Sequence, residues 1–460
     1  PAAIVALFLF AFKTIYLDHN DSVLRHSRFD GQTVANIQTP LQINFDDQLM
    51  LMGYDLSSAS VRADGLLELA LYWRILRPPD ADYSIAVHLI DDQGRRYGQK
   101  DSQHPAGYPA SRWQMDTYGR DLHRLAVWPG TPPGAYTIQV GVYDVTTGRS
   151  LDVRDGAGAP IGTIYNLAPV RVTSPARAPD PDDIEISQRL SVDLGGGLRL
   201  LGLDPPPDQV NAGDHLPLTL YWQAISAPAG DYAARLALVA PDGAVLASQS
   251  AAPGRADYPT SDWPAGDVVR DGRSFLVPAG TPAGDHTLRL DLLDAGGEPL
   301  GPSADLLRVA VSAPERSFDT PLAQHPISAT LGGQATLLGY DLSGGAATAS
   351  LAPGQPFTLT LYWRAEATAQ ASYVAFAHLL DGAERIHAQS DRVPAAGLRP
   401  TTGWLPGEII RDIHTLTVVP DAPPGQYVLE VGMYDPTSGE RLGLLDGGDR
   451  ILLPTPVQVK

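Results

Sequence analysis

The stretch FTLTLYW, residues 357–363, decides the fold class of this chain. Its apolar residues alternate with threonine or tyrosine, so that the side chains from Phe357 to Trp363 on odd positions share one face. Successive side chains of a strand point to opposite faces, so this pattern is typical of a half-buried strand. Two further stretches, LELALYW at 67–73 and LPLTLYW at 216–222, repeat it. We therefore expect three tryptophans in structural cores, namely Trp73, Trp222 and Trp363.

Further landmarks follow each of these stretches at matching distances. A second tryptophan comes about 40 residues later, and an Arg-Asp pair follows it by seven residues. A turn ending in glycine and then a Tyr-Asp or Leu-Asp pair complete the series. The matching register predicts three copies of one building block. The second tryptophans are Trp113, Trp263 and Trp404, and the aspartates of the Arg-Asp pairs are Asp121, Asp271 and Asp412.

Strand-like segments recur at short intervals between turn signals, and we find no sustained helical period after the N-terminus. This pattern predicts an all-β fold of three tandem two-sheet sandwiches, in either an immunoglobulin-like or a jelly-roll order. A chain of 460 residues has room for about three domains of ordinary size. We expect the first unit at 41–174, the second unit at 182–312 and the third unit at 316–460, joined by linkers rich in Pro and Ala.

The first 17 residues differ from the rest of the chain. Residues 2–12 are wholly apolar, and the apolar character continues past Lys13 to Leu17. A membrane-spanning helix needs about 20 apolar residues. Residues 1–17 therefore fit the C-terminal part of a transmembrane helix, a short anchor or signal remnant, or a buried helix. The transmembrane helix and the short anchor both predict a membrane tether through residues 2–17, a polar connector at 18–40 and an extracytoplasmic location for everything that follows.

The composition excludes several classes of partner. The formal net charge is −19, whereas nucleic acids bind proteins through clustered Lys and Arg. The same charge argues against adhesion to anionic lipid headgroups. The chain contains no cysteine, which excludes disulfides, thiolate metal sites and cysteine nucleophiles.

The Arg-Asp pairs are the most conspicuous charged motif. Asp412 shares a strand face with the apolar Leu416, and the other two aspartates have the same relation to Leu125 and Phe275. We interpret the aspartates as inward-pointing residues that accept hydrogen bonds from a loop backbone. The alternative is the charged rim of a binding groove. No hydrolase, metalloprotease, phosphate-loop or dinucleotide motif is present in the sequence, so we expect no enzymatic activity, no cofactor and no metal.

The loop tryptophans Trp113, Trp263 and Trp404 allow two interpretations. Each indole can close the open end of its own sandwich, or it can stack on a sugar ring as a carbohydrate contact. The first interpretation, an indole that plugs the end of its sandwich, fits better, because the residue spacing around each tryptophan is the same in all three units. His88 and His378 occupy equal positions in two units, where packing is a better explanation than metal binding. The Asp-rich turns, such as Asp91-Asp92, lack the ligand density of a calcium site.

The third unit resembles a known kind of membrane-protein tail. The resemblance rests on LGYD at 338–341, LTLYWR at 359–364, WLPGE at 404–408 and PPGQY at 423–427. These motifs are similar to those of the extracytoplasmic β-sandwich tail of bacterial polytopic glycosyltransferases of the dolichyl-phosphate-mannose protein mannosyltransferase type. The first unit shares them, whereas the second unit departs from them at Leu203, Ala237 and Leu293.

The resemblance implies that any catalytic residues lie in membrane loops upstream of residue 1, so none is carried over to this chain. We expect a non-catalytic, membrane-tethered accessory module that presents glycan or polypeptide acceptors. The alternative is a structural or assembly protein of the cell surface, in which tandem sandwiches act as spacers and contact neighbouring proteins.

Overall fold

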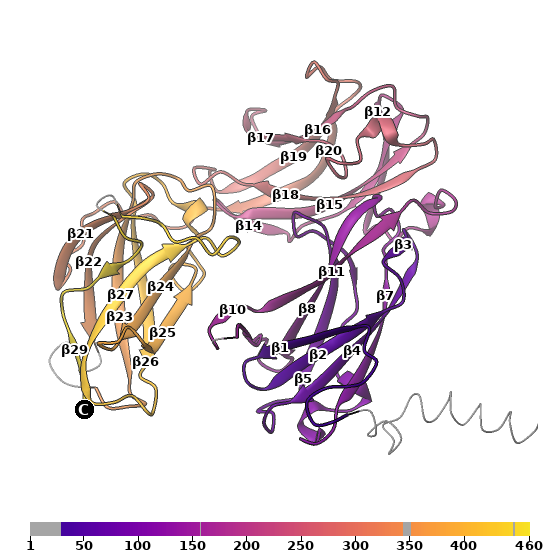
Figure 1. Ribbon diagram of the computed structural model, residues 1–460. Coiled ribbons are helices and arrows are strands. Elements are labelled where there is room, and N and C mark those ends of the chain that lie inside the picture. The colour runs from indigo at the N-terminus through magenta and orange to yellow at the C-terminus, as the bar shows by residue number, and fades with distance from the viewer. Residues whose placement is uncertain (1–28, 157, 344–350, 445–446) are drawn as a thin grey trace, which may run out of the picture.

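The computed structural model of the chain describes residues 29–156, 158–343, 351–444 and 447–460 (Figure 1). Throughout these ranges the fold is all-β, as the alternation predicts, and the helical segments are short 3₁₀ turns. None of the helices in the described ranges has the length and apolar character needed to cross a membrane. The expected membrane segment at 1–17 and residues 18–28 of the expected connector at 18–40 lie outside the described residues.

The first unit contains a six-stranded and a five-stranded sheet, whose strands pair antiparallel except where β3 meets β11. Strand β1 begins at Thr39, two residues before the expected start of the unit. The six-stranded sheet runs β10 (Pro160–Gly162), β9 (Val153–Arg154), β1 (Thr39–Phe45), β2 (Leu49–Leu56), β4 (Leu66–Ile75), β7 (Gly119–Ala126). The five-stranded sheet runs β3 (Ser60–Arg62), β11 (Ile164–Thr173), β8 (Gly134–Asp144), β5 (Tyr83–Ile90), β6 (Arg96–Gln99).

The second unit has a four-stranded and a five-stranded sheet, again with one parallel pair, β14 with β20. The four-stranded sheet runs β12 (Gln188–Gly195), β13 (Leu198–Asp204), β15 (His215–Ala224), β18 (Val268–Leu276). The five-stranded sheet runs β14 (Gln209–Asn211), β20 (Ala304–Ser312), β19 (Gly284–Leu293), β16 (Ala233–Val239), β17 (Val245–Ala251).

The third unit follows the same order of strands. Its four-stranded sheet runs β21 (His325–Leu331), β22 (Ala335–Ser343), β23 (Pro356–Ala365), β26 (Ile409–Thr417). Its second sheet runs β25 (Ile386–Arg392), β24 (Val374–Leu380), β27 (Gly425–Tyr434), β28 (Ile451–Leu452), and β29 (Val457–Val459) also pairs with β27. A parallel bridge between Leu351 and Val459 stands where the other units have their parallel strand pairs.

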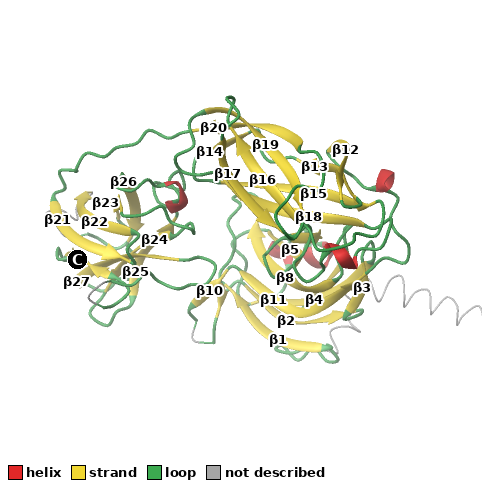
Figure 2. Cartoon of the chain, turned by 90° about the horizontal axis from the view of Figure 1, so that it is seen from above, coloured by secondary structure: helices red, strands yellow, loops and turns green. Residues whose placement is uncertain are grey.

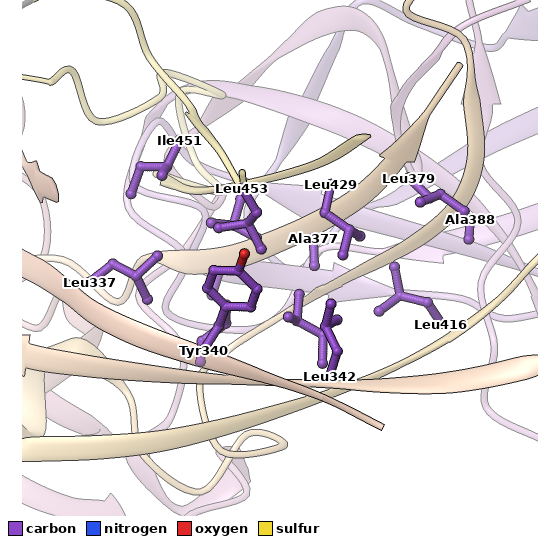
Figure 3. Packing of buried hydrophobic residues seen from close by; sticks show 14 of the residues in the cluster. Leu337, Tyr340, Leu342, Ala377, Leu379, Ala388, Leu416, Leu429, Ile451 and Leu453 are labelled. Carbon is purple, nitrogen blue, oxygen red and sulfur yellow. The ribbon is translucent and has the colours of Figure 1, made fainter. Parts of the chain in front are cut away.

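Three large clusters of buried hydrophobic side chains lie between these pairs of sheets. They draw on residues between Phe45 and Val172, between Leu194 and Val311, and between Leu331 and Val459. Figure 3 shows part of the third cluster, with Leu337 and Leu416 from one sheet facing Leu429 from the other. Each fully buried leucine contributes on the order of 1.5–3 kcal/mol, so these alternating faces hold the sheets together.

The outer face of each Trp-bearing sheet carries a hydrogen bond that explains two sequence motifs together. The tyrosine of Leu-Tyr-Trp donates its hydroxyl to the aspartate at the end of the neighbouring strand. The pairs and oxygen–oxygen distances are Tyr72–Asp55 2.7 Å, Tyr221–Asp204 2.7 Å and Tyr362–Asp341 2.8 Å. In the first two units, the chain just before the first strand covers this face. Val34 and Phe29 pack near Tyr72, and Ile184 packs with Tyr221.

Neighbouring units touch directly. The Arg95 guanidinium of the first unit donates to the carbonyl oxygens of Gly254 and Gly272 in the second, at 3.0 and 3.1 Å. The Thr402 hydroxyl of the third unit donates to the Gly213 carbonyl of the second at 2.6 Å. In Figures 1 and 2 the strands of the first two units lie against each other, and the third unit stands to one side. Ordered contacts of this kind restrict the hinges between units.

Candidate binding site at the seam between the first and second units

The three loop tryptophans are buried. Trp113, Trp263 and Trp404 have 7, 1 and 1% of their surface exposed. Each indole N–H donates to the carbonyl five residues earlier, that of Tyr108, Tyr258 or Arg399. This arrangement is the plug geometry, because the ring fills the end of the core and the loop wraps around it. None of the three rings presents an open face on which a sugar could stack.

The core tryptophans Trp73, Trp222 and Trp363 have no exposed surface, and the aspartates Asp121, Asp271 and Asp412 point inward beside them. Asp121 and Asp412 each accept a hydrogen bond from a loop backbone, from the amides of Ala106 and Ala395. Asp271 instead accepts from the indole of Trp222 at 3.0 Å and from the side chain of Arg273. The Arg-Asp aspartates therefore tie loops and neighbouring side chains to the core.

Two buried histidines were not singled out from the sequence. His123 and His414 follow the aspartate by two residues, and their Nε2 atoms lie 2.6 and 2.9 Å from Asp121 and Asp412. Their signal is the spacing Asp-x-His, which places both side chains on one strand face. In the third unit Ser390 lies 3.0 Å from the other ring nitrogen. This Ser-His-Asp chain is closed to substrate, because His414 and Asp412 have no exposed surface.

His88 and His378 lie on the outer faces of two five-stranded sheets. His378 pairs with Glu430 and Asp391, each at 2.8 Å, and the Nε2 atom of His88 lies 3.6 Å from Asp101. The described residues contain no group of three or more His, Asp or Glu side chains that could hold a metal ion. The turn carboxylates bind their own turns, as Asp91 does with the amide of Gln93.

Trp128 is the one partly exposed tryptophan among the seven, all of which lie within the described residues. It follows β7 in the first unit and faces β18 of the second. The backbone amide of Arg270 on β18 donates to the Gly130 carbonyl at 2.7 Å, which fixes the loop against the strand. The Arg270 guanidinium lies 4.7 Å from the centre of the Trp128 ring and 5.2 Å from that of Tyr221. We call Trp128, Asp204, Tyr221 and Arg270 the Trp128 seam.

Charges in the seam are paired. Arg270 lies 3.7 Å from Asp204, whose other contacts include the Tyr221 hydroxyl and the amide of Ser187. Burial alone would raise the pKa of Asp204, but the hydrogen bonds from Tyr221 and Ser187 outweigh it and lower that pKa. Burial also raises the pKa of the Tyr221 hydroxyl, so the tyrosine stays neutral. At neutral pH the seam therefore holds one carboxylate and one guanidinium beside two aromatic rings.

Two hollows flank this stack. One, of about 390 Å³, is bordered by Pro129 and Glu185, and the other, of about 510 Å³, by Arg96 and Pro217. Both are lined by Trp128, Asp204 and Arg270. Their volumes fall in the range of small-molecule sites, and an aromatic ring with convergent polar groups suits orientation of a ligand. The arrangement can bind and position, and it contains no paired nucleophile and base.

Sequence reasoning missed Trp128, although a signal was present. In the register of the three units, Pro278 and Val419 stand at its position, so this indole is outside the repeated pattern. An aromatic residue that only one copy carries is not required by the core that all copies share.

Comparisons with known proteins give no family. No protein-family model matches the chain, and no curated protein matches it. Among solved structures, the chain is similar to a putative membrane anchored protein from Corynebacterium diphtheriae at 11% identity. The match covers 88% of this chain and 91% of that one, with a TM-score of 0.17. A similarity at that level carries no argument about function.

Proposed function

We propose that the chain is a non-catalytic array of three β-sandwich repeats that binds glycans and holds them, or other acceptors, at the outer surface of a cell. The observation that carries this proposal is the Trp128 seam. An indole at a cleft offers an apolar ring face, and the adjacent Asp204 and Arg270 supply an acceptor and donors for hydroxyl groups. The neutral balance of these two charges favours an uncharged ligand over a nucleic acid or a phosphate.

The proposal of three repeats is supported by an irregularity in strand pairing that all three units share. Each unit has a sheet bulge beside a glycine on its second strand, where a side chain would collide with the first strand. A Cβ atom at Gly53 or Gly202 would lie 2.5 or 2.2 Å from a carbonyl oxygen of Thr39 or Gln188. The third unit has the same bulge at Gly339. A shared irregularity of this kind supports descent of the three units from one building block.

The membrane tether is part of the proposal and rests on the apolar run at 2–17. With it, the bulk of the chain would lie outside the membrane, as an accessory part of a glycosyltransferase-like membrane protein. Expression with and without residues 2–17, followed by membrane flotation and protease accessibility on intact cells, tests both points. A chain that floats equally without them, or that resists external protease until lysis, argues against the tether or the orientation.

Glycan binding is tested with Trp128→Ala on an array of oligosaccharides built from hexoses and N-acetylhexosamines. Phe318→Ala is the matched control, because Phe318 is an exposed aromatic residue outside the seam. We expect binding by the unaltered chain and the control, and at least a tenfold loss with Trp128→Ala. Binding that ignores the Trp128 substitution, or the absence of any binding, rejects the seam as a glycan site.

The second candidate function is a cell-surface spacer. The specific observation in its favour is that the units contact each other through side chains, such as Arg95 with the backbone of the second unit and Thr402 with Gly213. A spacer needs restricted hinges, and these contacts supply them. Failure of the array experiment, together with one narrow distance distribution between spin labels on the first and third units, would favour this function.

A further inference from the structure

Each of the three units has a sheet equivalent to the five-stranded sheet of the first unit. The strand register shows which positions on the outer faces of these sheets correspond. In each unit, β5 or the strand equivalent to it pairs antiparallel with β8 or the strand equivalent to it. The equivalent cross-strand pairs are His88–Gln139 on β5 and β8, Ala237–Arg289 on β16 and β19, and His378–Glu430 on β24 and β27. Two residues earlier on the first strand stand Ala86, Arg235 and Phe376. The three faces can therefore be compared position by position.

The third unit fills this face with its own side chains. Phe376 covers it, and the Arg441 guanidinium lies 4.3 Å from the centre of the Phe376 ring. Glu430 binds His378 at 2.8 Å and Arg450 at 2.9 Å. The phenyl ring lies over Gly432 so closely that a Cβ atom there would be 2.4 Å from it. These side chains occupy the part of the face that Ala86 leaves open in the first unit.

The second unit fills the same face in a different way. The Arg235 guanidinium donates to Asp291 through two nitrogens, at 3.0 and 2.9 Å, and Ser303 also bonds Asp291. Arg289 donates to Asp305 at 2.7 Å. The side chains that project from the face therefore pair with one another.

In the first unit the same face is hollow. Ala86 stands where the third unit has Phe376, and the nearest atom to a Cβ built on Gly141, opposite Ala86, would be 3.6 Å away. The hollow measures about 310 Å³, and Ala86, Gly141 and Ile164 are among its apolar lining residues. Its floor lies on the paired strands β5 and β8, and Asp101, Ser150 and Thr163, which lie outside the strands, border it.

Two polar atoms in this hollow have no hydrogen-bond partner. They are Nε2 of His88 and Oδ1 of Asp101, which are buried and lie 3.6 Å apart. The other carboxylate oxygen of Asp101 accepts from Gln99 at 3.0 Å and from the Tyr143 hydroxyl at 3.4 Å. A buried polar atom without a partner is uncommon in folded proteins, because it loses its bonds to water without replacement. In the third unit the equivalent atoms are paired, His378 with Asp391 at 2.8 Å.

The charges of the hollow select a class of ligand. Asp101 carries one negative charge and Arg96 one positive charge, and both line the hollow. Burial first, and then the nearby Arg96, lowers the pKa of His88, so this ring is neutral at pH 7. A cation would meet Arg96 and an anion would meet Asp101. A neutral hydroxyl both donates and accepts, so it can satisfy the Asp101 oxygen and the His88 nitrogen together.

We infer that this hollow, with His88 and Asp101 at its polar side, is a pocket for one ring of a neutral sugar. Hydroxyl groups would bond Asp101, His88 and Gln139, and the C–H face of the ring would lie over Ala86, Gly141 and the side chain of Ile164. The inference deepens the proposed function and rests on it, because it names a second glycan subsite on the first unit that is separate from the Trp128 seam.

The test is saturation-transfer NMR with the full chain and four free sugars: mannose, glucose, galactose and N-acetylglucosamine. Ala86→Phe installs the ring that fills the third unit, and Asp101→Asn removes the carboxylate. Asp92→Asn is the control, since Asp92 is an exposed carboxylate in the adjoining turn. We expect at least one sugar to show transfer with the unaltered chain and with the control. Ala86→Phe should abolish that transfer, and Asp101→Asn should weaken binding at least tenfold.

Several results would overturn the inference. These are no transfer to any of the four sugars, equal transfer with Ala86→Phe, or preferential binding of arginine methyl ester, a cationic probe. If Ala86→Phe lowers the folded fraction by circular dichroism, Gln139→Arg replaces it, because the second unit has arginine at that position. Trp128→Ala separates the two proposals: free-sugar binding that survives in this variant while array binding is lost supports both sites. Loss of both signals in Trp128→Ala rejects the second subsite.

Discussion

Replacement of Asp412 by alanine should destabilise the third unit strongly. Both carboxylate oxygens are used inside the core, one by the Ala395 amide at 2.8 Å and the other by Nε2 of His414 at 2.9 Å. Neither Asp412 nor His414 has exposed surface, so water cannot replace the lost acceptor. A buried donor left without a partner costs about 1–3 kcal/mol, and breaking a buried polar pair costs about 3–5 kcal/mol. We expect a loss of about 3–5 kcal/mol in the free energy of opening of the third unit.

Native-state hydrogen exchange read by mass spectrometry suits this measurement, because it reports opening of each unit separately. Peptides from β26 and β23 should exchange faster in the variant, while those from β18 in the second unit serve as an internal reference. Asp421→Ala is the matched control, since Asp421 is an exposed carboxylate of the same unit. We expect that control to change the opening free energy by less than about 0.5 kcal/mol.

The reasoning also fixes the behaviour of a double variant. With Asp412 removed, His414 has already lost its acceptor, so Asp412→Ala and His414→Ala together should cost less than the sum of the two. A coupling of about 0.5–3 kcal/mol is typical of such pairs. A change below about 1 kcal/mol for Asp412→Ala, or strictly additive losses, would refute the structural role. The Arg-Asp pair would then be better explained as the rim of a groove.

Three further predictions concern single positions. Trp404→Ala should cost about 3–5 kcal/mol in the third unit by the same exchange experiment, because it removes a buried plug and leaves the Arg399 carbonyl without its donor. Gly202→Ala should lower the calorimetric melting temperature of the second unit, since its Cβ would lie 2.2 Å from the Gln188 carbonyl oxygen. Burial alone lowers the pKa of His378, but Asp391 and Glu430 raise it to about 9 from 6.5. Its contribution to stability is therefore complete below about pH 6.5 and is lost as the pH rises through about 9, and His378→Asn should flatten that decline in urea titrations.

Strand alternation is the part of the fold that the sequence predicts best. Leu359, Leu361 and Trp363 share a face by parity, and none of them has exposed surface. Burial on one side of a sheet imposes this period on any strand, so the pattern is visible without knowledge of the neighbours. The Asp-Gly and Pro-Gly turns mark strand ends for the same local reason, since a turn depends on the backbone preferences of a few residues.

Contacts between segments far apart in the chain produce no periodic pattern in the sequence. Strand parity places Tyr221 on the outer face, but it does not record that Ile184, from the segment before the first strand of the second unit, packs against it. The stack of Arg270 on Trp128 joins two units, and no local pattern records which loop meets which strand. The partners of Asp121 were predictable in kind, because a buried carboxylate needs donors, but not in identity.

Positions at which the three units carry different side chains point to candidate binding sites, because packing of the shared core does not determine the residue there. The inner faces of the three units are constrained by packing, and they carry one pattern of leucine, phenylalanine and tryptophan. Their outer faces keep the strand pairing but differ in side chains, with Ala86, Arg235 and Phe376 at one position. Substitution on an outer face costs the fold little, so such positions are free to follow a ligand. A comparison of the three units therefore needs no relatives to single out the hollow at Ala86, because the other two units show how the same face looks when the chain fills it.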